Sequence, residues 1–402
     1  MKIFVINCGS SSIKFQLYKM PEENHIAKGK VEKDATGNAW LEGIFGSKEV
    51  IINEKGFSVR EGIHRILSEF INPENECLKS LQEIDVVGHR LIHGCRKDKS
   101  CVEVSDSLME YMNSCISLAP LHYPANIEGI KAVSEWIPQA LQTGVFDTAF
   151  HHTIPEKAFL YGIPLKWYKQ HQIRKYGFHG TSHKYVAKRV CEISGLPFLK
   201  SKIISCHLGN GASVAAIKNG RSVDTSMGMT PVEGLLMGTR SGDIDAGVLI
   251  YLQEQLHLTV EEVQNEINKE GGLLGLSGVS SDYRDVFLAA GNGNKNAQTA
   301  LEVYYYRIKK YIGAYAAVLG GMDALVFTGG VGENSSETRR KACDELDFLG
   351  IQLSKNKNIA LNGTEAEISA RESKVKVFII PTNEELIIAR EVFEFTKTKL
   401  KD

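Results

Sequence analysis

The sequence predicts an α/β protein made of two related domains. Its 402 residues exceed the usual length of one domain, and 43% of them are hydrophobic, which is enough apolar material for two cores. Short strand-like runs alternate with helical stretches along the chain, a pattern typical of α/β layers. The segments 3–19 and 203–219 also share one local pattern: a strand, a turn of small residues and a second strand. A duplicated domain explains that repetition, and two unrelated hairpins are the alternative.

The expected elements follow from apolar periodicity. Six apolar runs predict strands at 3–7, 85–92, 144–150, 202–208, 324–330 and 375–381. Three helices are predicted over 108–115, 183–195 and 299–319. The polar stretch 21–62 is expected to form a meander with loops.

Charge, apolar runs and cysteines exclude several classes of protein. The formal net charge is -1, so no basic excess suggests a nucleic-acid partner. The apolar run near the N-terminus is too short for a signal peptide, and no run reaches the ~18 residues of a membrane span. The 8 cysteines include no CxxC pair, which favours reduced thiols over disulfides or a zinc site. We therefore expect a cytoplasmic protein whose partners are small molecules.

The stretch NCGSSSIKF, from Asn7 to Phe15, breaks a buried strand with one glycine and three serines. Small residues present backbone N–H groups and hydroxyls in a turn that can hold an anion, and Lys14 adds a positive charge. A plain hairpin tip with a solvated lysine is the alternative. If the domain is duplicated, the tip GNGAS at 209–213 is its counterpart, and the two could grip a polyphosphate from both sides.

Several familiar motifs are absent. The chain has no GxxxxGK[ST], and both GNGAS and GVGEN lack the third glycine of a dinucleotide fingerprint. HExxH and GxSxG are also missing, which argues against a zinc protease and a serine hydrolase. What remains is a set of segments suited to binding anions.

Two expected strands carry polar residues. GHRLIHG (88–94) contains Arg90 and His93, and FDTAFHH (146–152) contains Asp147, a residue that is uncommon in strands. These residues indicate a site. A surface arginine and a turn-capping aspartate are the structural alternatives.

The loop YGFHGTSH (176–183) precedes a predicted helix. Thr181 or Ser182 is expected to cap that helix. His179 lies before the cap and is expected to face a cleft, whereas His183 is expected on the helix surface.

The longest glycine-rich stretch is MGMTPVEGLLMGTRSGDIDAG, 227–247. It places Arg240 among glycines without a local partner, as a phosphoryl-transfer site requires. Asp243 and Asp245 are interpreted as caps of the next helix.

Two further segments suit a nucleotide. The glycines of TGGVGENS (328–335) let the backbone approach a flat ligand or a phosphate. SSDYRD (280–285) could place Asp282 and Arg284 beside a ribose or a base.

The stretch PTNEELIIA (381–389) opens the last predicted helix. Thr382 and Glu385 have the spacing of a capping box, which gives Glu385 a structural role. Glu384, with Asn383 beside it, is left to hold a hydrated Mg²⁺.

Taken together, these segments resemble the acetokinase family, whose members are acetate kinases within the actin, Hsp70 and sugar-kinase superfamily. The resemblance extends from Asn7 to about Leu386. It rests on segments in the family's order and spacing: NCGSSSIKF, GHRLIHG, APLHYPAN, FDTAFH, YGFHGTSH, HLGNGAS, DTSMGMTPVEGLLMGTRSGDID, TGGVGENS and PTNEEL.

The resemblance implies two duplicated ribonuclease-H-like domains of the actin-like ATPase type, with the active site in the cleft between them. We expect an N-terminal domain of 1–149 plus 385–402, closed by the C-terminal helix, and a nucleotide-binding domain of 150–384. It also implies Mg²⁺-dependent, reversible transfer of the ATP γ-phosphoryl group to acetate, giving acetyl phosphate and ADP. Mn²⁺ is the expected substitute for Mg²⁺, and the expected assembly is a homodimer.

Residue roles are carried over by matching positions. The implied catalytic residues are Asp147, His179, Arg240 and Arg90. The implied acid-binding residues are Arg90, Ile92, Leu121, Phe178 and Pro231. The implied ATP- and phosphate-binding residues are Ser12, Lys14, His207, Leu208, Gly209, Asn210, Gly211, Asp282, Tyr283, Arg284, Gly330, Val331, Gly332, Glu333 and Asn334. The implied metal-associated residues are Asn7 and Glu384.

Acetate should titrate like a glutamate side chain, with a pKa of about 4.3, so the nucleophile is already ionised at neutral pH. No general base is then required. We therefore expect Asp147 to orient Arg90, His179 or metal-bound water rather than to accept a proton.

The chain departs from the family pattern at three positions: Ile92 in place of valine, Tyr123 in place of asparagine and Ala246 in place of proline. Isoleucine narrows the acid pocket, and a one-methylene mismatch is worth about 1 to 3 kcal/mol, so acetate is favoured over propionate. A propionate or butyrate kinase, a non-enzymatic ATP-gated clamp and a pyrophosphate-using enzyme are the rival functions.

Overall fold

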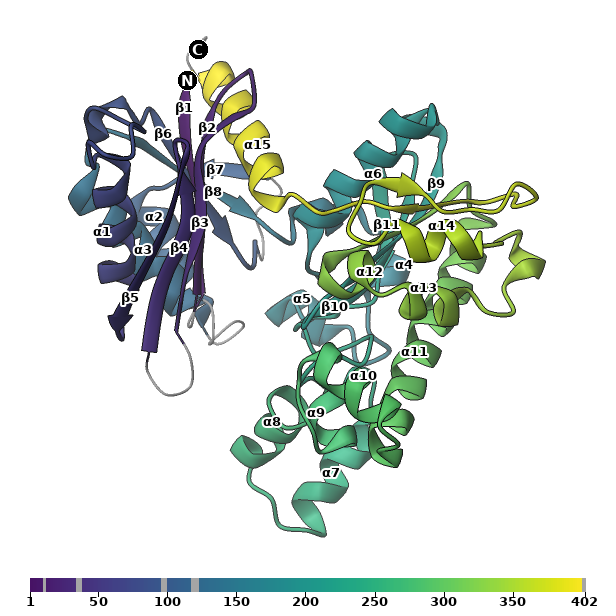
Figure 1. Ribbon diagram of the computed structural model, residues 1–402. Helices are drawn as coiled ribbons and strands as arrows, with labels where there is room; N and C mark the ends of the chain where they lie inside the picture. The colour runs from purple at the N-terminus through teal and green to yellow at the C-terminus, as the bar shows by residue number, and fades with distance from the viewer. Residues whose placement is uncertain (10–11, 34–37, 95–99, 117–122, 400–402) are drawn as a thin grey trace. The chain divides into compact units, whose positions relative to one another are not determined.

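The computed structural model describes residues 1–9, 12–33, 38–94, 100–116 and 123–399 (Figure 1). The chain forms two compact units. Unit 1 consists of Met1–Ala149 together with Asn383–Asp402, and unit 2 is the continuous segment Phe150–Thr382. The sequence analysis predicted that the C-terminal segment of the first domain begins at residue 385, two residues later than the Asn383 found in the structure.

Unit 1 contains one sheet of eight strands in the order β5-β4-β3-β2-β1-β6-β8-β7. Its elements are β1 (Lys2–Cys8), β2 (Ser12–Lys19), β3 (Asn24–Lys33), β4 (Asn38–Phe45), β5 (Lys48–Lys55), α1 (Val59–Phe70), β6 (Val86–Leu91), β7 (Cys101–Glu103), α2 (Asp106–Ser114), α3 (Tyr123–Trp136), β8 (Leu141–Phe146) and α15 (Glu384–Lys399). Neighbouring strands from β1 to β5 pair antiparallel, whereas β1, β6 and β8 pair parallel.

Unit 2 contains a sheet of six strands in the order β11-β10-β9-β12-β14-β13. Its elements are α4 (Glu156–Phe159), α5 (Lys166–His171), α6 (Gly180–Ser194), β9 (Lys202–Leu208), β10 (Ala212–Lys218), β11 (Arg221–Thr225), α7 (Ala246–Glu254), α8 (Val260–Asn268), α9 (Gly272–Ser277), α10 (Tyr283–Gly291), α11 (Lys295–Leu319), β12 (Ala324–Thr328), α12 (Gly329–Asn334), α13 (Ser336–Cys343), α14 (Lys355–Ala360), β13 (Ala366–Glu367) and β14 (Lys376–Ile379).

The two sheets repeat one topology. In each, three antiparallel strands (β3-β2-β1 and β11-β10-β9) continue into two parallel strands (β6-β8 and β12-β14). The hairpins β1-β2 and β9-β10 occupy the same place in this order, which confirms the duplicated α/β architecture. The six predicted strands are all present, and β3, β4 and β5 form the predicted meander. Strand β8 ends at Phe146, earlier than predicted, because residues 149–153 form a 3₁₀ turn.

The sheet of unit 1 is covered on both faces. On one face the rings of Phe4 and Phe15 pack against Phe70 of α1, and α3 adds apolar side chains to the same core. On the other face α15 buries Ile388 and Val392 against β1, β6 and β8 (Figure 1). The helix lies so close that a Cβ on Gly88 would come within 2.8 Å of Val392, so only glycine fits there.

The sheet of unit 2 is covered by α6 on one face, where Val186 and Val190 pack against Ile203 and Val326. The long helix α11 packs against β9 and β10 (Figure 1). All seven cysteines within the described ranges are free thiols. None of the helices in these ranges is both long and apolar enough to cross a bilayer.

One buried histidine makes the stability of unit 1 depend on pH. His89 is 3% exposed on β6, and its Nε2 lies 2.8 Å from Oε1 of Gln142. Burial lowers the pKa of His89 from 6.5 to about 4, although the bond to Gln142 opposes that shift. The folded chain therefore disfavours the charged form of this imidazole.

We expect the free energy of unfolding to decrease as pH falls from 6.5 to about 4, because the unfolded chain then binds a proton that the folded chain excludes. The loss attributable to His89 is about 3 kcal/mol at the acid end of this range. Urea unfolding at several pH values should show that the free energy of unfolding of His89→Phe decreases less than that of the wild type over this pH range. His64→Gln, which changes an exposed histidine of the same unit, is the control. Equal pH slopes for wild type and His89→Phe would contradict the assignment.

Candidate functional site

Arg90 lies at the centre of a charged cluster in unit 1. It is near the carboxyl end of β6, beside Val145 of β8, and Asp147 follows that neighbouring strand directly. Nη2 of Arg90 donates to Oδ2 of Asp147 at 3.0 Å. Nε lies 3.4 Å from Oε2 of Glu384, which begins α15. The predicted arginine, aspartate and glutamate therefore come together in one unit.

These charges are shielded from water. The side chains of Arg90, Asp147 and Glu384 are 12%, 1% and 17% exposed. Burial acts to lower the pKa of Arg90, but Asp147, Glu384 and Glu385 outweigh it, so the pKa is raised. The buried Nε of Arg90 has no hydrogen-bond partner among the described residues. It is an N–H group suited to a carboxylate or phosphate oxygen.

The start of α15 differs from the predicted capping box. Oδ1 of Asn383, not Thr382, accepts from the backbone N–H of Leu386 at 3.0 Å. Glu385 instead lies beside Gln16, whose Nε2 donates to its carboxylate at 3.3 Å. Burial and the neighbouring Glu384 raise the pKa of Glu385. The capping-box spacing was misleading because Thr382 belongs to unit 2, where its backbone N–H donates to Glu333 and its hydroxyl bonds Ser182.

The hairpin tip of unit 1 lies beside this cluster. Asn7, near the end of β1, pairs with Lys14 across the hairpin, and the Lys14 charge acts on Glu385. Asn126 of α3 donates to the backbone oxygen of Cys8 at 2.9 Å and so holds the tip from behind. Ser12 begins β2, and two residues of the tip, 10 and 11, lie outside the described ranges.

In unit 2, Arg240 and His179 converge on the second hairpin tip. A Cβ on Gly211 would lie 3.5 Å from Nη1 of Arg240 and 3.5 Å from the His179 ring. Within the described ranges Arg240 forms no ion pair, and its Nη1 donates to the backbone oxygen of Pro231 at 3.4 Å. Burial lowers the pKa of Arg240. The guanidinium is thus held in place without a carboxylate to neutralise it.

Histidines and hydroxyls form a network behind this tip. The rings of His179 and His207 stack at 4.3 Å, and Nδ1 of His179 lies 2.9 Å from Oγ of Ser213. His183 Nε2 lies 2.8 Å from the same hydroxyl, and His183 is completely buried. The prediction of a surface histidine is therefore wrong, because α6 turns this position toward the sheet.

The predicted cap of α6 is also wrong. The helix starts at Gly180, and His179 occupies the N-cap with a left-handed φ of 56° and no side-chain cap bond. Ser182 instead bonds Nδ1 of His207 at 2.8 Å and the hydroxyl of Thr382 at 2.9 Å. Left-handed backbone for a residue other than glycine is uncommon and marks a position held by its surroundings.

The loop that carries Arg240 is tethered at two points. Oε2 of Glu233 accepts from the Tyr161 hydroxyl at 2.6 Å, and its Oε1 lies 3.2 Å from Lys175. Asp243 accepts from the Tyr311 hydroxyl at 2.9 Å and from the backbone N–H of Gly234. Asp243 is therefore a loop tether rather than the predicted cap.

Asp245 does cap a helix, as predicted. It accepts from the backbone N–H of Gly247 in the first turn of α7. The loop also bonds directly to the hairpin tip, since the N–H of Gly238 donates to the backbone oxygen of Asn210 at 2.9 Å.

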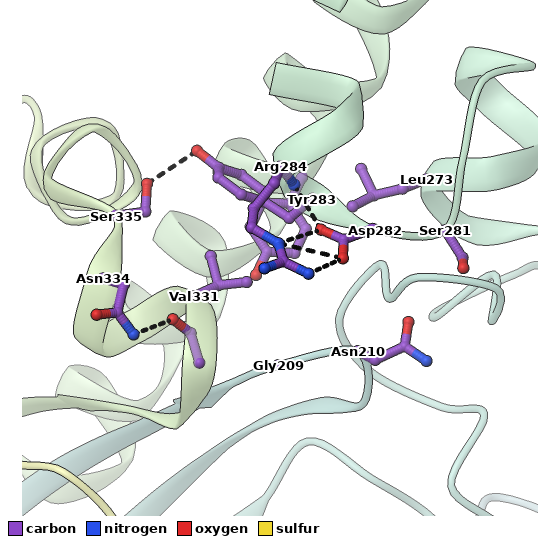
Figure 2. Close-up of a pocket in the computed structure, with 12 residues that line it drawn as sticks. Gly209, Asn210, Leu273, Ser281, Asp282, Tyr283, Arg284, Val331, Asn334 and Ser335 are labelled. Atoms are coloured by element: carbon purple, nitrogen blue, oxygen red, sulfur yellow. Dashed lines mark hydrogen bonds and ion pairs between the residues drawn. The ribbon is translucent and has the colours of Figure 1, made fainter. Parts of the chain in front are cut away.

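Unit 2 also contains a cavity of about 680 Å³ (Figure 2). That volume lies in the range of ~300–1,000 Å³ found for small-molecule sites. The predicted nucleotide residues that line it are Gly209, Asn210, Asp282, Tyr283, Arg284, Gly330, Val331 and Asn334. The other predicted residues of unit 2, which are His207, Leu208, Gly211, Gly332 and Glu333, are not among its lining residues.

Two walls of the cavity are joined by hydroxyl groups. Figure 2 shows the hydrogen bond between the Tyr283 hydroxyl and Ser335. The Tyr283 hydroxyl lies 2.9 Å from Oγ of Ser335 and 2.9 Å from the Tyr305 hydroxyl. Asp282 caps α10 and pairs with Arg284 at 2.6 Å, which lowers the pKa of Asp282. The side chain of Arg284 is 83% exposed at this wall of the cavity.

Four lining residues were not predicted: Leu273, Ser281, Tyr304 and Ser335. Ser281 and Ser335 lie within the predicted segments SSDYRD and TGGVGENS but were not named as binding residues. Leu273 and Tyr304 lie in ordinary helical stretches that carry no signal.

The predicted acid-binding residues lie in both units. Ile92 is buried just after β6 in unit 1, and Phe178 and Pro231 belong to unit 2. Leu121 lies outside the described residues. Tyr123, one of the departures from the family pattern, is completely buried and bonds the backbone oxygen of His93.

Comparison with known proteins gives full-length matches. The profile of the Acetokinase family matches residues 2–390. An acetate kinase from Bacteroides thetaiotaomicron is 50% identical over 398 residues, covering 99% of this chain and 100% of that protein. One from Pseudothermotoga lettingae is 49% identical over 402 residues, covering 100% of this chain and 99% of that protein.

The comparison with solved structures also gives matches along nearly the whole chain. The crystal structure of Porphyromonas gingivalis acetate kinase has a TM-score of 0.90 and 48% identity, covering 98% of this chain and 99% of that one. A propionate kinase from Francisella tularensis has a TM-score of 0.89 and 39% identity, covering 97% of this chain and 98% of that one.

Proposed function

Because the chain belongs to the acetokinase family, we propose that its two clusters serve one reaction, with the acid bound by the Arg90 cluster of unit 1 and the nucleotide by the cavity of unit 2. The activity is that of an acetate kinase, a phosphotransferase whose acceptor is a carboxyl group. This membership also argues against a non-enzymatic ATP-gated clamp.

The residue assignments depend mainly on one observation, which is that Arg240 is buried without an ion-pair partner among the described residues. It is largely buried, forms no ion pair within the described ranges and lies at the tip whose Gly209 and Asn210 line the cavity. An uncompensated guanidinium is costly to bury, and an anion that binds there recovers that cost. A phosphoryl group in transfer is such an anion.

The proposed reaction is a direct in-line transfer. A carboxylate oxygen of acetate attacks the γ-phosphorus of ATP, an O–P bond forms, and the bond to the β,γ-bridging oxygen breaks to release ADP. Acetate is ionised at neutral pH, so no side chain has to remove a proton. The chain's task is to align two anions and to offset their charge, which Arg90, Arg240 and His179 are suited to do.

We assign Asp147 an orienting role in this scheme. Its carboxylate is buried and accepts from Arg90, which fixes the direction of the guanidinium. A base waiting to accept a proton would not need that ion pair. The pair instead keeps Arg90 charged in a site with little water.

The oxygen donors at the end of β1 and the start of α15 fit a magnesium ion. Mg²⁺ takes one or two carboxylates together with water and substrate phosphates, and the carboxylate of Glu384 is partly exposed, with the amide of Asn7 as a second oxygen donor. Within the described ranges no group of three or more His, Cys, Asp and Glu side chains could hold a metal ion. Bound Mg²⁺ would neutralise phosphate charge, and Mn²⁺ would fit the same donors.

We also propose a homodimer that buries α7. None of the residues of this helix is buried, although Val248, Ile250 and Tyr251 are apolar and 41%, 53% and 57% exposed. Leu256 and Val260 extend the surface. Exposed apolar side chains grouped in this way suit an interface between two copies of the chain. Light scattering should give twice the chain mass, and a monomer at micromolar concentration would contradict this.

The proposed location is the cytoplasm. ATP is available there, and the free cysteines within the described ranges suit a reducing compartment.

Acetate and propionate are the two acids to compare, because a propionate kinase is among the structural relatives. We propose acetate as the preferred substrate, since Ile92 is buried and bulkier than the valine common in the family. The preference is modest, because one methylene is worth about 1 to 3 kcal/mol.

A hydroxylamine trap tests the reaction and the preference together. Purified protein with Mg²⁺, ATP and either acetate or propionate should form acetyl hydroxamate about tenfold or more faster than propionyl hydroxamate. A faster propionate reaction would overturn the preference and keep the mechanism. The absence of hydroxamate from either acid would overturn the proposed function.

Arg240→Ala should lower kcat about 10³-fold or more, because it removes the guanidinium assigned to the transferring group. Arg240→Lys should recover little of that loss, since lysine lacks the planar fork. Arg189→Ala, which changes an exposed, ion-paired arginine of unit 2, is the control. A kcat within about tenfold of wild type, a difference of only about 1.4 kcal/mol, would remove Arg240 from this role.

Glu384→Ala should raise the Mg²⁺ concentration needed for half-maximal rate, because it removes the proposed carboxylate ligand. Glu394→Ala changes an exposed glutamate of the same helix and serves as the control. If both variants give the wild-type magnesium titration, Glu384 serves only as a partner of Arg90.

A further inference from the structure

Arg339 is an arginine whose side chain the fold hides completely. It lies on α13, is 0% exposed and is the largest fully buried side chain among the residues that the structure describes. Burial lowers its pKa to about 10, so it is still charged at neutral pH. Within the described ranges no carboxylate forms an ion pair with it. A buried charge without a counter-charge normally costs considerable stability.

The guanidinium is satisfied by neutral oxygens alone. Nε donates to Oδ1 of Asn358 at 2.7 Å, and Nη2 donates to the backbone oxygen of Asn358 and to Oδ1 of Asn362. Nη1 donates to the backbone oxygens of Gly332 and Glu333, both at 2.8 Å. These five bonds use all five N–H groups of an arginine. The arrangement demands the planar fork, which no lysine can reproduce.

Two of these acceptors, the backbone oxygens of Gly332 and Glu333, lie in the last turn of α12. The last carbonyls of a helix have no partner within the helix, and a cation at that end is favourable. At the opposite end the carboxylate of Glu333 accepts from the backbone N–H of Gly329 at 2.8 Å. A single six-residue helix is therefore held at its end by a buried cation and at its start by a carboxylate.

This helix forms one wall of the cavity. Gly330, Val331 and Asn334 line it, and Arg339 does not. Arg339 therefore bonds the last turn of this short helix without being a lining residue of the cavity. A position that required only packing would be filled at lower cost by an apolar side chain.

We propose that Arg339 is a positioning residue for nucleotide binding, which clamps the carbonyls of Gly332 and Glu333 and thereby fixes the cavity face of α12. This inference rests on the proposed function of the cavity as the nucleotide site. Loss of the clamp weakens nucleotide binding and leaves acid binding in unit 1 unchanged.

The test is the affinity for ADP, measured by calorimetry without acetate. Arg339→Lys should raise the Kd of ADP about tenfold, because lysine loses at least two of five charged hydrogen bonds. The KM for acetate at saturating ATP should stay within about twofold. Arg340→Lys is a matched control, since Arg340 is the adjacent arginine, half exposed and paired with Glu337.

Thermal melts and near-ultraviolet circular dichroism establish that each variant is folded at the assay temperature. If Arg339→Lys does not fold, Asn362→Ala decides, because Asn362 is exposed and its loss removes only one acceptor. A severalfold higher Kd for ADP in that variant supports the clamp. A wild-type Kd in the folded Arg339→Lys, or in Asn362→Ala if the first variant is unfolded, overturns it.

A variant that loses ADP and acetate affinity together would also overturn the inference, because that pattern indicates general destabilisation. The proposed function is tested separately by the hydroxamate assay. Suppose that the wild type binds ADP, that Arg339→Lys binds it more weakly, and that the wild type forms no hydroxamate. This result would overturn the proposed reaction and support the positioning role of Arg339.

Discussion

Parallel pairing at the middle of each sheet is the constraint on which both sites depend. Strands β1, β6 and β8 run in one direction, so the residues at their carboxyl ends, Asn7, Arg90 and Asp147, meet at one edge of the sheet. Strands β9, β12 and β14 do the same in unit 2 and bring the tip after Leu208 beside the start of α12. A one-residue slip in either register would turn these side chains to the wrong face.

Three arginines illustrate different ways of keeping a charge out of water. Arg90 is compensated by carboxylates, which raise its pKa. Arg339 is compensated by carbonyls at a helix end, with a pKa of about 10. Arg240 has neither kind of partner within the described ranges, and burial lowers its pKa. Only the last is left in need of an external anion, which fits a ligand-dependent role better than a structural one.

The sequence was sufficient for the strands, the hairpin tips and most of the cavity wall, because those features depend on local composition. It was insufficient where a role depends on a distant partner. The helical period did not reveal that the sheet of unit 2 covers His183. The capping-box spacing did not reveal that Thr382 bonds Ser182 instead of capping α15. Arg339 was missed for the same reason, since its acceptors lie on other elements and arginine in a helix is ordinarily a surface residue.

The position of α15 has a consequence for folding during synthesis. The face of the unit 1 sheet around Gly88 is covered by Ile388 and Val392, which the ribosome adds after all of unit 2. The part of unit 1 that precedes unit 2 in the chain therefore lacks part of its core until α15 has been synthesised, whereas unit 2 is continuous and can fold as soon as it emerges. This inverts the usual N-terminal-first order of folding and leaves an apolar sheet face exposed to chaperones in the interval.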